Sequence, residues 1–182
     1  MFIMKIIIAG EGGQGVQAIA NIMTEAAYNQ GKQALYIPNF GVEQRGGVSV
    51  AFIQIDDKEI SSLKFTKADL VLALSPRAVT RTLQYSDSRT IFLYEADIAG
   101  VDLPQTAAQV RPIAAMQIVK EKLNTRVFNV LIMGAAIAAS KVVDMDYVIA
   151  ALEHNLKDKF KKNPALRQMN LEALRLGSEL VS

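Results

Sequence analysis

The 182-residue sequence contains no cysteine and only one histidine, His154. Without cysteine, the chain has no disulfide and no thiolate ligands for a zinc ion or an iron–sulfur cluster. His154 falls in a predicted helix with polar neighbours, where a surface or packing role is more typical than catalysis. The side chains that most often carry covalent or redox chemistry are therefore missing, and we expect no catalytic residue and no metal site in this chain.

Long apolar runs are also missing. The longest apolar stretch, residues 130–139, is well short of the roughly 18 residues that a membrane span needs. Residues 1–10 are apolar without a small-residue cleavage site, which predicts a buried strand rather than a signal peptide. With 51% hydrophobic and 21% charged residues, the composition is that of a globular protein. We expect a single domain over residues 1–182, located in the cytoplasm and without a membrane partner.

Charge is nearly balanced, with a net value of +2. The excess lies after residue 152 and includes the cluster Lys157, Lys159, Lys161 and Lys162. Such a cluster attracts anions, including nucleic acid, but Phe160 is the only aromatic residue within it. The pattern favours a solvated helix face, and no nucleic-acid partner is expected.

Five short segments are predicted to be strands because they are rich in β-branched residues and bounded by turn formers. These segments are residues 2–9, 33–37, 48–55, 69–74 and 90–94. The first and fourth are continuously apolar, which is typical of central parallel strands covered on both faces. Residues 48–55 and 59–61 are predicted to form a hairpin closed by Asp56, Asp57 and Lys58, so part of the sheet is expected to be antiparallel.

Helices are predicted between and after these strands. Residues 16–30 place Ala18 and Ile19 with other apolar side chains on one face and end at Gly31. Ser75 and Pro76 are suited to cap and begin a helix that runs to about residue 85. From about residue 113 the pattern is helical, with segments at 116–123, 128–141, from Asp144 or Asp146 to about 156, and at 164–177. This order predicts an α/β fold: a Rossmann-like, doubly wound, mostly parallel sheet with an antiparallel hairpin and a helical C-terminal part.

The segment 128–141 is apolar on nearly all sides and rich in glycine and alanine. A helix with so little polar surface is buried either in the core of its own chain or against another chain. In the second case its small-residue side forms a subunit contact, and a homodimer of protomers is one form of that contact.

A glycine-rich loop follows the first strand and precedes the first helix, with Gly10, Gly12, Gly13, Gln14 and Gly15 around Glu11. This G-x-G-x-x-G spacing is typical of loops that bring a diphosphate to the N–H groups of a helix N-terminus. The second strand, however, lacks the acid that a dinucleotide site uses for the ribose hydroxyls. Binding of NAD(P) or FAD by a stand-alone protein therefore remains the alternative hypothesis. Close strand–helix packing, or contact with another subunit or an anion, also accounts for the glycines.

A second loop joins the second and third strands and holds Gly41, Glu43, Gln44, Arg45, Gly46 and Gly47. It follows a parallel strand, so it is expected at the same edge of the sheet as the first loop. Arg45 offers a bidentate fork for a carboxylate or phosphate, and the two glycines permit close backbone approach.

Together, the glycine loop at residues 10–15 and the Gly-Val-Glu-Gln-Arg-Gly-Gly loop at residues 41–47 resemble the gamma subunit of 2-oxoacid:ferredoxin oxidoreductases. The resemblance extends through Glu59-Ile60-Ser61, Ala68-Asp69 and Asn129, and covers most of the chain. The Glu43-Gln44-Arg45 loop is similar to the 2-oxoglutarate and pyruvate types rather than to the indolepyruvate branch, which has a histidine–methionine version. Ser62 departs from the family, whose members often have proline there.

The resemblance implies a subunit of an enzyme that decarboxylates a 2-oxoacid, forms an acyl-CoA and passes electrons to ferredoxin. Thiamine diphosphate, Mg²⁺ and iron–sulfur clusters then belong to the alpha, beta and, where present, delta subunits. The gamma subunit is associated with the coenzyme A side of the site. The resemblance implies that the two loops contact the alpha subunit and the CoA diphosphate.

Overall fold

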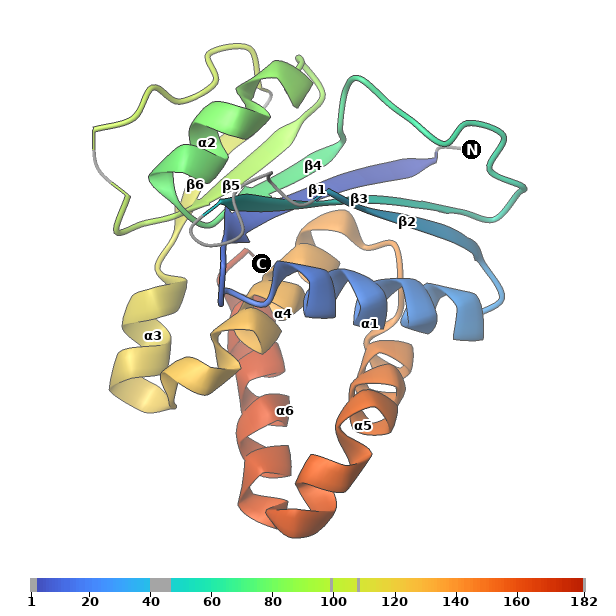
Figure 1. Cartoon of the computed structure of the whole chain (residues 1–182), viewed down its shortest axis with the longest axis vertical. Coiled ribbons are helices and arrows are strands. Elements are labelled where there is room, and N and C mark those ends of the chain that lie inside the picture. The colour runs from blue at the N-terminus through green and yellow to red at the C-terminus, as the bar shows by residue number, and fades with distance from the viewer. Residues whose placement is uncertain (1–2, 40–46, 99, 108, 182) are drawn as a thin grey trace.

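The computed structural model describes residues 3–39, 47–98, 100–107 and 109–181. Its centre is a six-stranded sheet in the order β2-β3-β1-β4-β5-β6 (Figure 1). The strands are β1 (Met4–Glu11), β2 (Gln33–Asn39), β3 (Val48–Asp56), β4 (Leu70–Ala73), β5 (Ile91–Glu95) and β6 (Gln109–Ile113). Strand β3 runs antiparallel to both of its neighbours, whereas β1, β4, β5 and β6 pair in parallel. The predicted α/β class with a mostly parallel sheet is confirmed.

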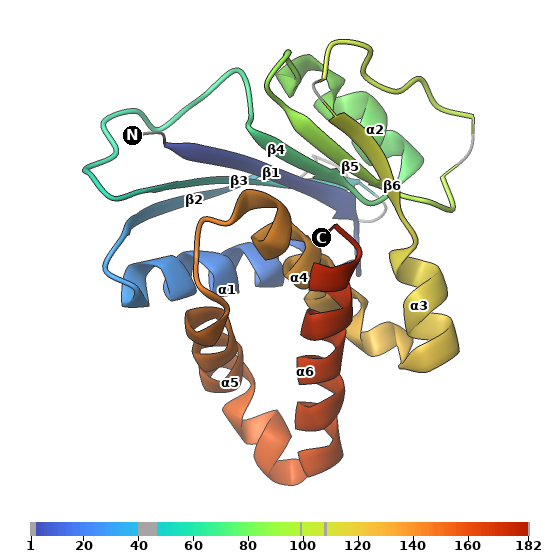
Figure 2. The same cartoon turned by 180° about the vertical axis from the view of Figure 1, so that it is seen from behind.

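Helices cover the two faces of the sheet unequally. The helix α2 (Pro76–Thr82), extended by the 3₁₀ turn Leu83–Tyr85, lies on one face, which we call the upper face. The other five helices lie on the lower side (Figures 1 and 2). They are α1 (Val16–Asn29), α3 (Ala115–Lys122), α4 (Phe128–Ser140), α5 (Met145–Lys162) and α6 (Pro164–Glu179). None of the helices in the described ranges is both long and apolar enough to cross a membrane.

Local sequence accounts for the boundaries of the first two helices. Helix α1 buries Ile19, Ile22 and Met23 and is followed by Gly31 at φ 86°, where a side chain would be strained, although Ala18 is exposed. Helix α2 begins at Pro76, and the Ser75 hydroxyl accepts the Ala78 N–H at 3.2 Å. Both helix starts agree with the predicted ones.

The antiparallel pairing differs from the predicted hairpin. Residues 59–61 are not in a strand, and β3 instead pairs with β1 and β2 through residues such as Gln54, opposite both Lys5 and Leu35. The side chains of β3 are mostly buried, so insertion between two strands removes more apolar surface from water than a terminal hairpin would. Asp57 forms an ion pair with Lys32 Nζ at 2.6 Å, next to the end of β3.

The sixth strand was not predicted. Arg111 and Pro112 interrupt the apolar pattern of β6, and most of its residues are partly or fully exposed. Strand β6 lies at the edge of the sheet, where a proline costs no ladder hydrogen bond on its free side.

Helices α4 and α6 pack directly on each other. A Cβ atom at Gly134 would lie 2.2 Å from the Leu174 carbonyl oxygen, and one at Gly177 would lie 1.9 Å from that of Leu131. The two glycines therefore let the backbones approach more closely than any side chain allows. The hypothesis that the small-residue side of residues 128–141 forms a subunit contact is wrong, because α6 of the same chain covers it.

Candidate functional site

The carboxyl ends of β1 and β4 lie side by side and lead to opposite faces of the sheet. The chain leaves β1 for α1 on the lower face, whereas it leaves β4 for α2 on the upper face (Figure 1). A crevice opens at such a switch point, and ligands of open α/β sheets bind there. The glycine loop at residues 10–15 occupies this edge.

The tip of the glycine loop exposes its backbone. The Gln14 N–H donates to the Glu11 carbonyl at 3.1 Å and closes a tight turn in which Gly13 has φ 93°. Gly12 and Gly13 are exposed, and a Cβ at either position would have no heavy atom of the described residues within 4 Å. Space is therefore available for another molecule to approach this backbone closely.

The two outer glycines instead serve internal packing. A Cβ at Gly10 would lie 2.6 Å from Gln14 Oε1 and 3.3 Å from Leu74 Cβ. Gly15 has φ 74°, and a Cβ there would lie 2.8 Å from the side chain of Asn129 on α4. These glycines allow β1 and α1 to pack against β4 and α4.

The side chain of Gln14 joins the ends of β1 and β4. Its Oε1 accepts the Glu11 N–H at 2.7 Å, and its Nε2 donates to the Leu74 carbonyl at 2.9 Å. The amide therefore spans the switch-point crevice from one strand to the other. It fixes the loop against the sheet and occupies part of the space between the two strand ends.

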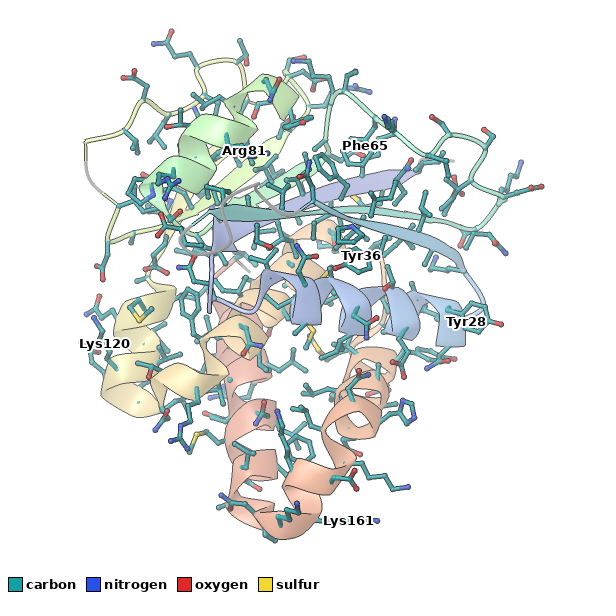
Figure 3. All side chains as sticks on the ribbon, viewed as in Figure 1. Tyr28, Tyr36, Phe65, Arg81, Lys120 and Lys161 are labelled. Carbon is teal, nitrogen blue, oxygen red and sulfur yellow. The ribbon has the colours of Figure 1, made fainter. Side chains whose placement is uncertain are left out.

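The first turn of α1 is anchored to the antiparallel strands. Gln17 Nε2 donates to Ser49 Oγ at 2.6 Å, and the Tyr36 hydroxyl donates to Gln17 Oε1. Tyr36 lies between β2 and α1 (Figure 3), and burial raises the pKa of its hydroxyl, which keeps it a donor. Among the described residues no side chain caps α1 at Gly15, which leaves the N–H groups of its first turn and the positive end of its dipole open to an anion.

The second predicted loop lies mostly outside the described residues: Gly41, Glu43, Gln44, Arg45 and Gly46 are not among them. Its two flanks are described. Ser49 lies opposite Gly10 and Val48 opposite Glu11, so Gly47 follows directly beyond the end of β1. Asn39, the last residue of β2, pairs with Val50. The loop thus starts and ends at the edge that carries the glycine loop.

Comparison with known proteins identifies the chain. Residues 5–180 match the family described as pyruvate ferredoxin/flavodoxin oxidoreductase. The chain belongs to this family. The sequence is 31% identical over 174 residues to the pyruvate/ketoisovalerate oxidoreductases common subunit gamma of Thermococcus litoralis, covering 89% of this chain and 91% of that one. The resemblance to a gamma subunit is confirmed.

Two solved structures share the fold of this gamma subunit. The keto/oxoacid ferredoxin oxidoreductase gamma subunit from Geobacter sulfurreducens PCA superimposes with a TM-score of 0.81 at 26% identity, covering 98% of each chain. A 2-oxoglutarate:ferredoxin oxidoreductase from Magnetococcus marinus, with 2-oxoglutarate, coenzyme A and succinyl-CoA bound, gives 0.88 at 23% identity. The whole of this chain covers 31% of that longer chain.

Glu95 is a buried carboxylate of the gamma subunit that the sequence patterns did not single out. It ends β5 and is 5% exposed; its Oε2 accepts the Met116 N–H of α3 at 3.2 Å, and its Oε1 has no hydrogen-bond partner among the described residues. Burial raises the pKa of Glu95 to about 6. The sequence signal that could have identified Glu95 is its position as an acid directly after the predicted apolar strand at residues 90–94. Its contact stabilises the start of α3 rather than the glycine loop.

The remaining candidates lie on the surface. His154 Nδ1 contacts Glu25 Oε1 at 2.7 Å and joins α5 to α1, with the histidine side chain largely exposed. Lys157, Lys159, Lys161 and Lys162 are exposed, as predicted for a solvated helix face. Within the described part of the chain, no three His, Cys, Asp or Glu side chains are grouped as metal ligands.

Proposed function

We propose that this gamma subunit supports CoA-dependent oxidative decarboxylation of a 2-oxoacid of the pyruvate or 2-oxoglutarate class, with electrons passed to ferredoxin. Its loops at residues 10–15 and 41–47 form one surface that contacts the alpha subunit and the diphosphate of CoA. The chain acts beside alpha, beta and, where present, delta subunits and contributes no reacting side chain.

The observation that carries this proposal is that the described flanks of the second loop, Asn39 and Gly47, lie at the edge of the sheet that holds the glycine loop. The open backbone at Gly12 and Gly13 and the uncapped start of α1 provide N–H donors and a positive dipole end. A diphosphate bridging to Arg45 would meet a second, bidentate donor. This donor set suits the diphosphate of CoA.

The residues of this chain do not fit thiamine diphosphate with Mg²⁺ or an iron–sulfur cluster. The sequence has no thiolate, and the described residues hold no set of grouped acidic or histidine ligands. We assign these cofactors to the partner subunits. The Magnetococcus marinus enzyme supports a shared assembly, because the region equivalent to this chain is there part of a longer chain.

The alternative, a stand-alone NAD(P)- or FAD-binding protein, meets an obstacle in the order of the strands. Strand β3 separates β2 from β1, so the end of β2 is not next to the glycine loop as a dinucleotide fold requires. No observation favours this alternative over the subunit role.

The test replaces Arg45 in the assembled complex. We expect Arg45→Ala to lower acyl-CoA formation at limiting CoA about 10-fold or more, because a charge-assisted bidentate contact contributes about 1.5–3 kcal/mol. Arg45→Lys keeps the charge but loses the bidentate guanidinium, so its rate of acyl-CoA formation should fall between those of Arg45→Ala and wild type. The melting temperature of the isolated chain should not change. Equal losses of melting temperature and activity would show that Arg45 is structural.

A further inference from the structure

The upper face of the sheet carries a groove over β2 and β3 that the proposed function does not use. Its volume is about 530 Å³, and its apolar lining consists of Ile37, Pro38, Phe52, Leu63, Phe65 and Tyr85. A neighbouring hollow of about 480 Å³ shares Asn39, Phe52 and Tyr85 and reaches Arg81 on α2. Figure 3 shows Phe65 and Arg81 on the same side of the sheet, opposite Tyr36.

The groove is held in shape by the body of the protein. Phe52 on β3 packs edge-to-face against Phe65 at 5.7 Å and against Tyr85 at 5.4 Å between ring centres. The buried Gln54 donates through Nε2 to the Ser62 carbonyl at 2.8 Å, which ties the segment before Phe65 to the sheet. These contacts fix the walls, so a partner would meet a preformed surface.

Leu63 stands at the rim of the groove and is 65% exposed. Two cations frame the apolar lining: Lys64 borders one hollow and Arg81 the other. Among the described residues, no carboxylate lines either hollow and neither cation has an ion-pair partner. An exposed leucine beside an aromatic groove with unpaired cations has the character of a protein interface.

We propose that this groove docks a segment of a partner subunit of the same oxidoreductase, which inserts a bulky apolar side chain flanked by carboxylates. The charge of the rim selects an acidic segment. The position also supports this occupant, because Pro38 and Asn39 of the groove lead directly into the loop at residues 40–46. The inference rests on the proposed function, since it requires the partner subunits of that oxidoreductase.

The test measures the affinity of the full-length gamma chain for the remaining, separately purified subunits by sedimentation or biolayer interferometry. One variant combines Lys64→Glu with Arg81→Glu, and a second is Leu63→Ser. The matched control combines Lys120→Glu with Tyr28→Ser, because both residues are exposed and belong to helices of the lower layer (Figure 3). We expect each groove variant to weaken the affinity for the other subunits 10-fold or more. The affinity of the charge-reversed variant should also lose most of its dependence on salt concentration. The affinity of the control should stay within twofold of wild type.

Each other outcome overturns the inference in a distinguishable way. If wild-type chain assembles and all variants bind equally, the groove is not the docking surface, and the proposed function stands. If wild-type chain does not assemble with the other subunits, both proposals fail. If Leu63→Ser abolishes self-association of the isolated chain, the occupant is a second copy. If CoA alone slows hydrogen exchange at residues 63–65, the occupant is a small anion.

Discussion

The two faces of the sheet differ in how completely helices cover them. Below the sheet, 35 buried hydrophobic residues of the described ranges form one continuous cluster with α1 and the four C-terminal helices. Above it, only 10 form the corresponding cluster, and α2 is the one described helix on that side. The lower layer therefore provides most of the stability, whereas the upper face and the carboxyl edge leave surface for partners.

The largest expected effect comes from the α4–α6 contact in the lower layer. Gly134→Ala places a methyl group against the Leu174 carbonyl and forces the helices apart, so we expect a loss of about 3 kcal/mol, or about 6–12 °C in melting temperature. Gly12→Ala is the matched control, because it faces open space, and should change stability by about 0.5 kcal/mol or less. Thermal unfolding of both variants measures the difference; equal values would contradict the contrast between core and edge.

Breaking the Gln14 bridge should have an intermediate effect. Gln14→Ala removes both hydrogen bonds between the ends of β1 and β4 and should lower the free energy of unfolding by about 1–2 kcal/mol. Urea titration measures this loss. Gln14→Glu keeps the acceptor for the Glu11 N–H but places a carboxylate oxygen against the Leu74 carbonyl oxygen, and should be at least as destabilising as Gln14→Ala. A Gln14→Ala chain as stable as wild type would mean that the bridge does not hold the loop.

Glu95 should make the stability of the protein depend on pH. Burial raises the folded pKa from 4.5 to about 6, so the folded state retains the proton to higher pH than the unfolded chain does. The contribution of Glu95 to the free energy of unfolding therefore falls by about 1–2 kcal/mol as pH rises through this interval. Urea titration gives the free energy of unfolding of wild type and of Glu95→Gln at pH 4.5 and at pH 7. The difference between the two proteins at each pH isolates this contribution. A difference that stays constant with pH would show that the carboxyl is not buried as described.

The smallest effect is expected on the upper face. Leu63→Ser should leave the free energy of unfolding within about 0.5 kcal/mol of wild type, because the side chain is 65% exposed. The same measurement on Phe65→Ser, whose ring packs on Phe52, should show a clear loss. Similar losses for the two variants would mean that Leu63 belongs to the core and not to a free surface.

Local sequence predicted where helices and strands lie along the chain better than it predicted which strands pair in the sheet. The cap and proline at Ser75 and Pro76 specify a helix start wherever the segment lies, and the apolar runs of β1 and β4 specify central strands. The position of β3 depends on how much apolar surface the whole sheet buries, so the turn at Asp56 suggested the wrong partner. The edge strand β6 carries too few apolar residues to show a pattern.

The site shows the same limit. The glycine spacing predicted a loop at the correct edge, but only the neighbouring atoms separate Gly10 and Gly15, which pack internally, from Gly12 and Gly13, which face open space. The roles of Gln14 and Glu95 depend on contacts with Leu74 and Met116, which are distant in sequence. Family resemblance supplied what residue types alone did not: a subunit role for a chain without cysteine.

The most direct test of the central claim is hydrogen exchange of the gamma chain in the assembled oxidoreductase, with and without CoA. If the two loops face the alpha subunit and the CoA diphosphate, amides at residues 10–18 and 41–47 should be protected on assembly and further protected by CoA. The amides of the exposed α5 surface at residues 157–162 serve as the internal reference and should not respond. Unchanged exchange at both loops, in a complex that forms acyl-CoA, would contradict the account.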